Sequence, residues 1–389
     1  MNAAFAGELR RLRELSGLSY RQLASLSTVS HTQISDLEHA RRRPTPDIAR
    51  ALDEALHACG RLTAMLRTPA PQDVEGELEA IELAQRSAAS DVSDGTLTRL
   101  ERAFDETARG YATVPPADLL PRVRRHLRYV EQLLAGRATL GRHRRLLVVG
   151  GWLSLLRATL HIDLQQRTAA GAHLSTAAEL SGQSGHAEIA AWCLETRAWD
   201  RLTRGDFRRA VELSQHAQAI APADGSAIVQ ATAQEGRAWA RLGDAQATRD
   251  ALGRVGRMAE HREMPEHPEH HYRYDPAKAH SYAATTLAWA GDPAAEQVAR
   301  DVITELEAEG ARPRRIASAR LDLGLALLAG KPRPEEAAQQ ARVAMRSGRI
   351  VPSNWWRVVE VVDGVTASGV PEAGDLREEC EALRPADEG

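Results

Sequence analysis

The sequence predicts an all-α protein made of a short N-terminal helical bundle and a longer array of helical hairpins. Three observations support this. Alanine, leucine and arginine recur throughout the chain, and aromatic residues make up only 4%. No stretch alternates apolar and polar residues as a half-buried strand would. Finally, a Gly-Asp pair repeatedly separates two segments of helical spacing. This composition is typical of soluble helical proteins.

The chain of 389 residues is too long for one ordinary hydrophobic core. A proline-containing segment, LRTPAPQDVEG at 66–76, separates the first part from the rest. We therefore predict an N-terminal domain at 1–67, a linker and connecting helix at 68–95, and a helical repeat domain at 96–385.

Charge is unevenly distributed along the chain. In residues 1–50, eight arginines outnumber five acidic residues, so this end has a formal charge of +3. The whole chain has a formal net charge of −3. The basic end is where a polyanion would bind. Three cysteines lie far apart at Cys59, Cys193 and Cys380, which indicates a reducing cytoplasm. The N-terminus does not resemble a signal peptide, and the apolar run at 146–156 is too short to span a bilayer.

The first two helices are predicted from apolar spacing and capping residues. Phe5, Leu9, Leu12 and Leu15 recur at helical intervals, and Gly17 ends the first helix. A second helix begins after Ser19, a good N-cap. Its inward positions are Leu23, Ala24 and Leu26.

The third and fourth helices follow from the same signals. Ser30 is expected to cap the third helix, with Val29 packed in the turn before it and Ile34 and Leu37 facing inward. Pro46 suits the first turn of the fourth helix, where its missing N–H has no cost. The apolar face of that helix consists of Ile48, Ala49, Leu52, Ala55 and Leu56.

Two short helices joined by a tight turn form a helix-turn-helix, whose second helix can enter the major groove of DNA. The outward face of the third helix carries short polar side chains that can meet base edges and phosphates. These are Ser30, His31, Thr32, Gln33, Ser35 and Asp36.

The motifs of this region resemble the phage-repressor-like, or XRE, family of DNA-binding domains. They are LRRLRELSGLS, then QLA at 22–24, VS at 29–30, IS at 34–35, LE at 37–38 and the closing RRRP at 41–44. The resemblance implies that His31, Thr32 and Asp36 contact bases and that Ser30, Arg41, Arg42 and Arg43 hold phosphates. The remaining predicted DNA-binding residues are Tyr20, Arg21, Gln33 and Ser35.

Three positions depart from the family pattern. Tyr20 stands where a phosphate-contacting glutamine is usual, Thr28 replaces a turn glycine, and Asp36 replaces a neutral or basic residue. Asp36 would either accept from a cytosine amino group or repel the DNA backbone. An alternative interpretation is that the arginine run is only a solvated surface and that Gln22 or Glu38 ties helices together.

The remaining chain reads as helix after helix with short breaks. Gly-Asp pairs begin at 205, 243 and 291, one further unit spans 319–345 with its turn at Gly330, and an earlier unit spans 145–180. These units resemble tetratricopeptide repeats, in which helical hairpins of about 34 residues stack into a superhelix with a concave face. The best copy is 190–222, with consensus residues Ala198, Gly205, Phe207, Ala210, Ala217 and Pro222.

Tryptophans recur on the predicted repeat helices. Aromatic residues at helical spacing are most often packing residues. We therefore expect the following tryptophans to lie in the core between helices: Trp152, Trp192, Trp199, Trp239 and Trp289.

The segment MPEHPEHHYRYDP at 264–276 concentrates histidines, acids and tyrosines. It lacks the His-Glu-x-x-His motif of zinc proteases, and Pro265 and Pro268 break the helix that such a motif needs. Its position between two hairpins predicts an inserted loop that either contacts an effector or plugs buried helix ends. The candidate effector-binding residues are His267, His270, His271, Tyr272, Arg273 and Tyr274.

No phosphate-binding loop, dinucleotide fingerprint or nucleophile elbow occurs in the sequence. We therefore expect no enzymatic activity, no cofactor and no metal. The combination of domains resembles bacterial one-component regulators, which implies a cytoplasmic homodimer that binds double-stranded operator DNA and a peptide or small-molecule effector. An interaction scaffold holding a protein partner, and a metal-dependent hydrolase, are the alternatives.

Overall fold

The structure is a computed structural model that describes residues 2–66, 83, 88–263, 265–274, 276–309, 312–329 and 331–384. The chain divides into two compact units, Met1–Ser87 and Ala88–Gly389. Most of the predicted linker and connecting helix at 68–95 lies outside the described residues, and so does the predicted turn at Gly330. Every regular element among the described residues is helical, so the predicted all-α fold class is confirmed.

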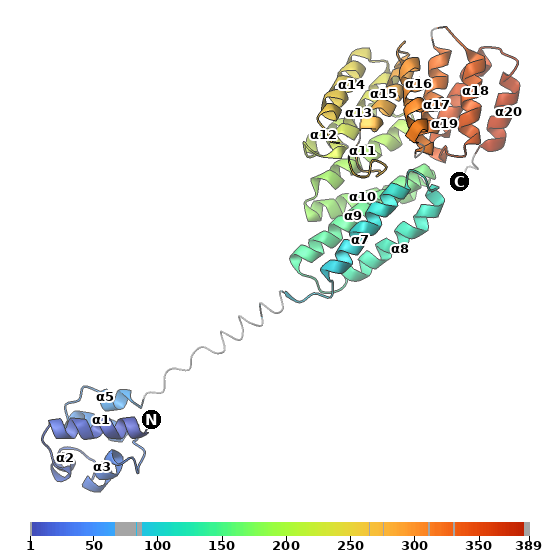
Figure 1. Ribbon diagram of the computed structural model, residues 1–389. Helices are drawn as coiled ribbons and strands as arrows, with labels where there is room; N and C mark the ends of the chain where they lie inside the picture. The colour runs from blue at the N-terminus through green and yellow to red at the C-terminus, as the bar shows by residue number, and fades with distance from the viewer. Residues whose placement is uncertain are drawn as a thin grey trace. The chain divides into compact units, whose positions relative to one another are not determined.

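The first unit is a small bundle of short helices (Figure 1). Its core contains Phe5, Leu9, Leu23, Ile34 and Leu52, each at most 1% exposed. These are positions that the apolar spacing assigns to the interior. The helices are α1 (Asn2–Leu15), α2 (Tyr20–Leu26), α3 (His31–Glu38), α4 (Pro46–Ala55) and α5 (Arg61–Ala64).

The predicted caps are present at the helix starts. Ser19 begins α2 and Ser30 begins α3, each with its hydroxyl accepting from a backbone N–H three residues on and its own N–H donating to a glutamine side chain. These reciprocal bonds satisfy donors that a helix start otherwise leaves free. Gly17 has φ of +65° just after α1 ends. Thr28, in place of the usual turn glycine, is not among the residues with positive φ.

Two apolar expectations for this unit were wrong. Leu15 is 72% exposed and Leu26 is 60% exposed. Each lies at the last residue of its helix, where the chain is already leaving the bundle. Val29, 3% exposed in the following turn, fills the core after the short helix α2 instead of Leu26.

Two buried acids tie the first unit together. The Glu38 carboxylate accepts from the Arg13 guanidinium at 2.6 and 3.0 Å and from the Tyr20 hydroxyl at 3.1 Å. The Asp53 carboxylate accepts from the backbone N–H groups of Leu62 and Thr63 at 2.9 and 2.8 Å. A buried carboxylate needs several donors to offset its desolvation, and here those donors come from a neighbouring helix. The bonds therefore join α1 to α3 and α4 to α5.

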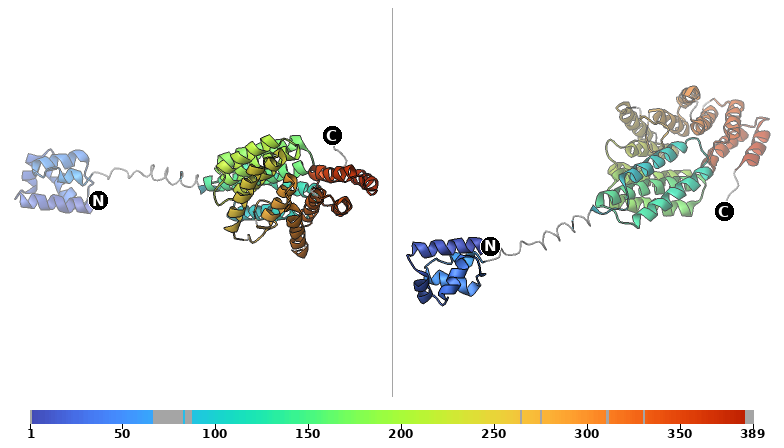
Figure 2. Two further views of the ribbon diagram at one scale, coloured as in Figure 1. Left: turned by 90° about the horizontal axis from the view of Figure 1, so that it is seen from above. Right: turned by 60° about the horizontal axis from the view of Figure 1, so that its bottom comes forward.

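The second unit consists of antiparallel helical hairpins stacked in chain order, from cyan to red in Figures 1 and 2. Its helices are α7 (Asp94–Gly110), α8 (Pro116–Leu134), α9 (Leu140–Asp163), α10 (Arg167–Ser184), α11 (Ala187–Thr203), α12 (Phe207–Ile220), α13 (Ser226–Leu242), α14 (Ala245–Glu260), α15 (Pro276–Ala290), α16 (Ala295–Glu309), α17 (Pro313–Leu328), α18 (Pro334–Arg346), η1 (Pro352–Asn354), α19 (Trp355–Ala367) and α20 (Ala373–Leu383).

The recurring Gly-Asp pairs form the turns within three of the hairpins. The glycines at 205, 243 and 291 have φ of +78°, +76° and +66°, a backbone conformation that glycine adopts without strain. In the first two turns the aspartate that follows the glycine accepts a hydrogen bond from a backbone N–H of the next helix, at 3.4 and 2.9 Å, and in the third turn it accepts from the Ala294 N–H just before α16, at 2.8 Å. The dipeptide therefore ends the first helix and satisfies a donor at the start of the second, which explains why it recurs.

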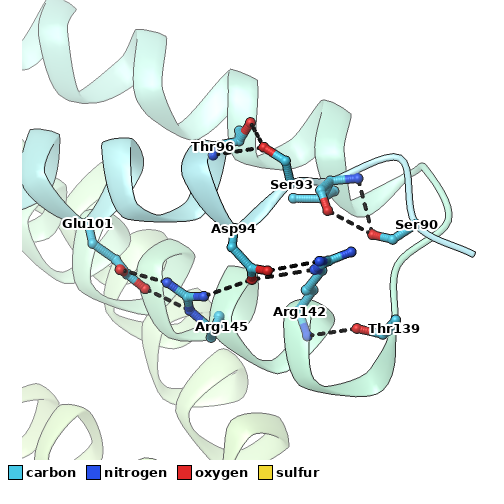
Figure 3. A network of polar contacts seen from close by, with 9 residues as sticks. Ser90, Ser93, Asp94, Thr96, Glu101, Thr139, Arg142 and Arg145 are labelled. Carbon is cyan, nitrogen blue, oxygen red and sulfur yellow. Dashed lines mark hydrogen bonds and ion pairs between the residues drawn. The ribbon is translucent and has the colours of Figure 1, made fainter. Parts of the chain in front are cut away.

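A network of ion pairs joins the first two hairpins (Figure 3). Asp94, in the first turn of α7, accepts from Arg142 at 2.8 Å and from Arg145 at 3.2 Å. Arg145 also makes a two-bond contact with Glu101, about two turns further along α7. Both arginines belong to α9. Because these groups are partly exposed to solvent, the network sets the alignment of α7 on α9 more than it adds stability.

The hairpin array closes on itself within the second unit. The Arg314 guanidinium donates to the Val114 carbonyl at 2.7 Å, and the Arg349 guanidinium donates to the Thr113 carbonyl at 2.9 Å. At a neighbouring point the Gln165 amide donates to the Pro352 carbonyl at 3.0 Å. These contacts join residues about 200 positions apart, so the last hairpins return to the ends of the first helices and surround an inner space.

The helix α9 is long and apolar enough to cross a membrane by length and composition. However, 83% of its most apolar window is buried inside the protein. Gly150 and Gly151 lie against Leu180 and Ile189 of the next helices, so this helix is the central packing element of the unit. Its apolar character is explained by burial on several sides.

Candidate DNA-binding surface and central cavity

The first candidate site is the outward surface of α3 in the first unit. His31 and Thr32 are exposed in its first turn, and Ser35 and Asp36 are half-buried one turn later. The core residues Ile34 and Leu37 fix the opposite face of the same helix. The N-terminal turn of α3 therefore presents side chains able to contact base edges, next to backbone N–H groups that favour phosphate.

Ser30 and Gln33 have a local structural role. The Ser30 hydroxyl accepts from the Gln33 N–H at 3.3 Å, and the Gln33 side-chain oxygen accepts from the Ser30 N–H at 3.2 Å. This pair holds the first turn of α3 in place and leaves the Gln33 amide nitrogen as its outward donor. The predicted DNA contact of these two residues remains a prediction.

The exposed arginines cluster beyond the end of α3. Arg41, Arg42 and Arg43 are exposed, and the N–H of Arg41 donates to the Asp36 carbonyl at 2.8 Å. The Arg41 guanidinium also lies 3.9 Å from the Asp36 carboxylate. Asp36 therefore has a cation beside it, which weakens the repulsion that an isolated carboxylate would exert on a DNA backbone. Arg21 is likewise exposed, on α2.

Tyr20 has its hydroxyl directed at the bundle interior. The hydroxyl donates to Glu38, and the Arg13 guanidinium lies over the tyrosine ring, 4.5 Å from its centre. Gln22 bonds within the cap of its own helix. Glu38 therefore ties helices together, as the alternative interpretation proposed, and Tyr20 shares that role, whereas Gln22 caps its own helix α2.

The second candidate site is a cavity of about 230 Å³ inside the closed hairpin array. It is lined mainly by the first helix of successive hairpins, α11, α13, α15, α17 and α19, with further residues from the end of α7 and from α9. The lining residues of α11 lie at 192, 195, 196, 199, 202 and 203, one face of the helix. The cavity thus occupies the concave side of the array.

Cationic side chains dominate the cavity wall. Seven arginine or lysine residues line it, against three acidic residues. The cationic residues are Arg237, Lys278, Arg312, Arg314, Arg315, Arg349 and Arg357, and the acidic residues are Glu195, Glu269 and Asp322.

Burial weakens the negative charge of two of these acids. Desolvation raises the pKa of Glu195 to about 7, although a hydrogen bond from the Gln230 amide at 3.1 Å favours the charged form. Desolvation also raises the pKa of Asp322, which forms an ion pair with Arg357. Glu195 is therefore only partly ionised near neutral pH, and the cavity is more positive than its residue count indicates.

Tryptophans form much of the apolar part of the wall. Trp192, Trp199 and Trp289 line the cavity together with Trp356. The expectation that the repeat tryptophans are only core residues was therefore incomplete for these three positions. Trp239 does not line the cavity, and its indole N–H donates to Glu235 at 3.1 Å.

The described part of the inserted segment, residues 265–274, packs between the first and middle hairpins. The N–H of His271 donates to the Ala108 carbonyl at 3.2 Å, and the Lys278 ammonium donates to the carbonyls of His270, His271 and Arg273. One ammonium group thus holds the bend of the segment. This geometry supports the prediction that the loop plugs buried helix ends.

The segment also separates two hollows. His271 lines the central cavity, whereas His270, Tyr272 and Arg273 line a second cavity of about 470 Å³. Tyr272 is 3% exposed, lies against Trp152 at 5.1 Å between ring centres, and shares a hydrogen bond with Thr159 at 3.2 Å.

The other two candidates lie elsewhere. Tyr274 is buried in a separate cluster with Val229 and Val255. His267 contacts Arg109 at 3.1 Å and lines neither hollow. Of the six candidate effector residues, the structure places only His271 at the central cavity. Desolvation lowers the pKa of His270 to about 3 and that of His271 well below its usual range, so both rings are neutral near pH 7.

Most residues of the cavity wall were not among the candidate residues predicted from the sequence. Gln230 and Arg237 lie on the buried side of α13, and Asp322 and Arg357 on the buried sides of α17 and α19. Polar residues seven positions apart on the apolar face of a predicted helix are a detectable signal, because such a face normally holds apolar residues only. The pattern in SAIVQATAQEGRAWARL carries this signal.

Comparison with known proteins agrees with the geometry of the first unit. Residues 4–66 match the family described as a helix-turn-helix domain. The first unit is thus a helix-turn-helix domain, with α2 and α3 as the two helices of the motif.

No curated protein matches the sequence. Among solved structures, the chain is similar to PlcR of Bacillus thuringiensis, whose crystal structure is in complex with the peptide PapR7 and DNA. The two share 12% identity over 67% of this chain and 95% of that chain, with a TM-score of 0.25. At that TM-score the likeness is not evidence about this chain.

Proposed function

We propose that this protein is a sequence-specific DNA-binding transcription regulator that acts in the cytoplasm. The observation that carries the proposal is the surface of α3. Its first turn is fixed by a double cap and a buried apolar face and presents His31 and Thr32 to solvent, and three exposed arginines follow the other end of the helix. A helix held in this way, next to a basic loop, has the features that major-groove recognition requires.

The helical repeat unit is proposed to sense a peptide or small-molecule effector and to mediate homodimerisation. The closed hairpin array encloses a cavity with a polar and aromatic wall, which is the kind of space that small ligands occupy. A homodimer would place two copies of α3 on two half-sites of one operator. An effector would act by favouring one arrangement of those two copies.

Selection of binding sites from random double-stranded DNA by the full-length protein tests DNA recognition. The proposal expects one enriched motif, and an affinity for it that falls steeply as salt rises. Replacing Arg41, Arg42 and Arg43 together with alanine should weaken binding to all sequences and reduce the salt dependence. Arg61→Ala is the matched control, since this exposed arginine lies on α5, outside the motif.

If no motif is enriched at low salt, the proposal fails. If Arg61→Ala weakens binding as much as loss of the three arginines, the assignment of the basic loop fails. Equilibrium sedimentation of the same protein measures the oligomeric state, and a monomer at micromolar concentration would contradict the dimeric part of the proposal.

A further inference from the structure

Buried hydrogen-bond donors without acceptors gather on one wall of the central cavity. They are the Nε atoms of Arg237 and Arg357 and the indole nitrogens of Trp289 and Trp356. None of these four atoms has a hydrogen-bond partner among the described residues. Buried donors are normally satisfied, since each one left without an acceptor destabilises the fold. The missing partner of this wall is a group that brings acceptors.

Arg237 is the most informative member of the wall. Its side chain lies on the buried face of α13, and the residue is 8% exposed. The guanidinium lies over the Tyr282 ring at 4.5 Å and donates to the Gln234 amide oxygen. Within the described part of the chain it forms no ion pair with a carboxylate. A buried charge is normally paired, so this one is suited to an anion supplied from outside.

The two indoles form an angled apolar surface beside that charge, with 44° between the ring planes. The Trp289 and Trp356 rings are 5.6 Å apart between centres. Arg241 fixes them in place: its guanidinium lies 4.5 Å from the centre of Trp289 and 5.0 Å from that of Trp356. The Arg241 charge is already offset by a two-bond ion pair with Glu360 at 2.6 Å. The wall therefore combines an aromatic surface held in place by Arg241 with buried donors on residues that line the cavity.

We propose that the central cavity binds a small aromatic carboxylate, whose ring lies against Trp289 and Trp356 and whose carboxylate oxygens accept from Arg237, Arg357 and the indole N–H groups. Each of the two parts of this ligand complements one feature of the wall. The carboxylate satisfies the buried donors and the unpaired charge, and the ring covers the indole surface.

The cavity volume restricts the source of the carboxylate. About 230 Å³ is below the usual range of roughly 300–1,000 Å³ for drug-sized ligands. It therefore accommodates either a free aromatic acid or the last residue of a peptide with its terminal carboxylate. The regulatory consequence of binding rests on the proposed function, whereas binding itself does not.

Calorimetric titration of the full-length protein tests the ligand class with matched pairs of probes. One pair is 2-naphthoate and 2-naphthamide, and the other is N-acetyltryptophan and N-acetyltryptophanamide. In each pair only the charge differs substantially. We expect at least one of the acids to bind and its amide to bind at least about ten-fold more weakly. Tighter binding of naphthoate would identify a free acid as the source, and tighter binding of N-acetyltryptophan would identify a peptide end.

Two variants locate the binding to this wall. Trp289→Phe retains an aromatic ring and removes one N–H donor, and Arg237→Met removes the charge while keeping an apolar stem. Each substitution should weaken the binding of the acid at least about ten-fold. Trp239→Phe and Arg254→Met are the matched controls, because both residues are bonded to Glu235 away from the cavity, and neither should change the affinity. Urea unfolding of each variant confirms that it remains folded.

The proposal is overturned if neither acid binds at millimolar concentration, if acid and amide bind equally, or if the folded Trp289→Phe and Arg237→Met proteins both bind as well as the wild type. DNA binding by the same variants separates this result from the proposed function. Enrichment of a DNA motif together with loss of acid binding would overturn the ligand class alone. Acid binding without an enriched motif would overturn the proposed function alone.

Discussion

The burial of Glu195 makes one defined contribution to the pH dependence of folding in the second unit. Its pKa is about 7 in the folded chain, against an ordinary value of 4.5, because desolvation outweighs the bond from Gln230 and the charges of Arg237 and Lys278. Between these pH values the folded chain keeps a proton that the unfolded chain has released. The contribution of Glu195 to stability therefore falls as pH rises from about 4.5 to 7 and then levels off.

The magnitude follows from the two pKa values. Their difference corresponds to roughly 3 kcal/mol of unfolding free energy lost above pH 7. Glu195→Gln keeps a group of the same shape without the charge. We expect the variant and the wild type to have similar stability at pH 4.5, and the variant to be more stable by about 3 kcal/mol at pH 8.

Urea unfolding followed by tryptophan fluorescence measures this difference. All seven tryptophans lie at or beyond residue 152, so their emission reports only the second unit. The pKa of buried Asp163 is also raised, to about 6, and contributes a further loss in the same direction to both proteins. The difference between variant and wild type isolates Glu195. A difference that stays constant from pH 5 to pH 8 would refute the reasoning.

Three further predictions concern individual interactions. Glu38→Ala should destabilise the first unit by about 2–4 kcal/mol because it leaves Arg13 without its carboxylate, and faster amide hydrogen exchange in α1 and α3 would report this. Ser30→Ala should cost about 1 kcal/mol through loss of the α3 cap, seen as faster exchange in the first turn of α3; unchanged exchange would contradict it. Gly243→Ala, at φ of +76°, should destabilise the second unit by about 1 kcal/mol, whereas Gly256→Ala, within α14 and free of neighbours, should stabilise it by up to about 1 kcal/mol. Urea midpoints of this pair that move in the same direction would contradict the last prediction.

The helix-turn-helix domain could be predicted in detail because its signals are local. A cap, a short apolar spacing and a turn lie within a few residues of one another, so Ser19, Ser30 and Ile34 were assigned correctly. The errors at Leu15 and Leu26 arose where a helix ends, because periodicity alone does not show where the chain leaves the bundle.

The hairpin array could also be predicted, since each Gly-Asp turn is a local feature with its own physical cause. The cavity could not. Its wall combines residues from Tyr111 to Arg357, and what brings them together is the return of the last hairpins to the first. That closure depends on side chains such as Arg314, which donates to a carbonyl 200 positions away. A local sequence pattern does not predict such a long-range bond.

The segment at 264–276 shows the limit of reading residue types alone. Its histidines and tyrosines were predicted to contact an effector. Most of them instead pack and form hydrogen bonds inside the fold, with Tyr272 buried against Trp152. The polar groups that line the cavity lie instead within ordinary helical pattern, at positions such as Arg237.

The central claim is that the first turn of α3 reads DNA bases. Its most direct test compares the motif selected from random DNA by the wild type with those selected by His31→Ala and by Thr32→Ala. A residue that contacts one base pair contributes roughly 1–3 kcal/mol of discrimination there. We predict that each variant loses preference at one position, repeated in both half-sites, while the rest of the motif is kept. Motifs identical to that of the wild type in both variants would contradict the account.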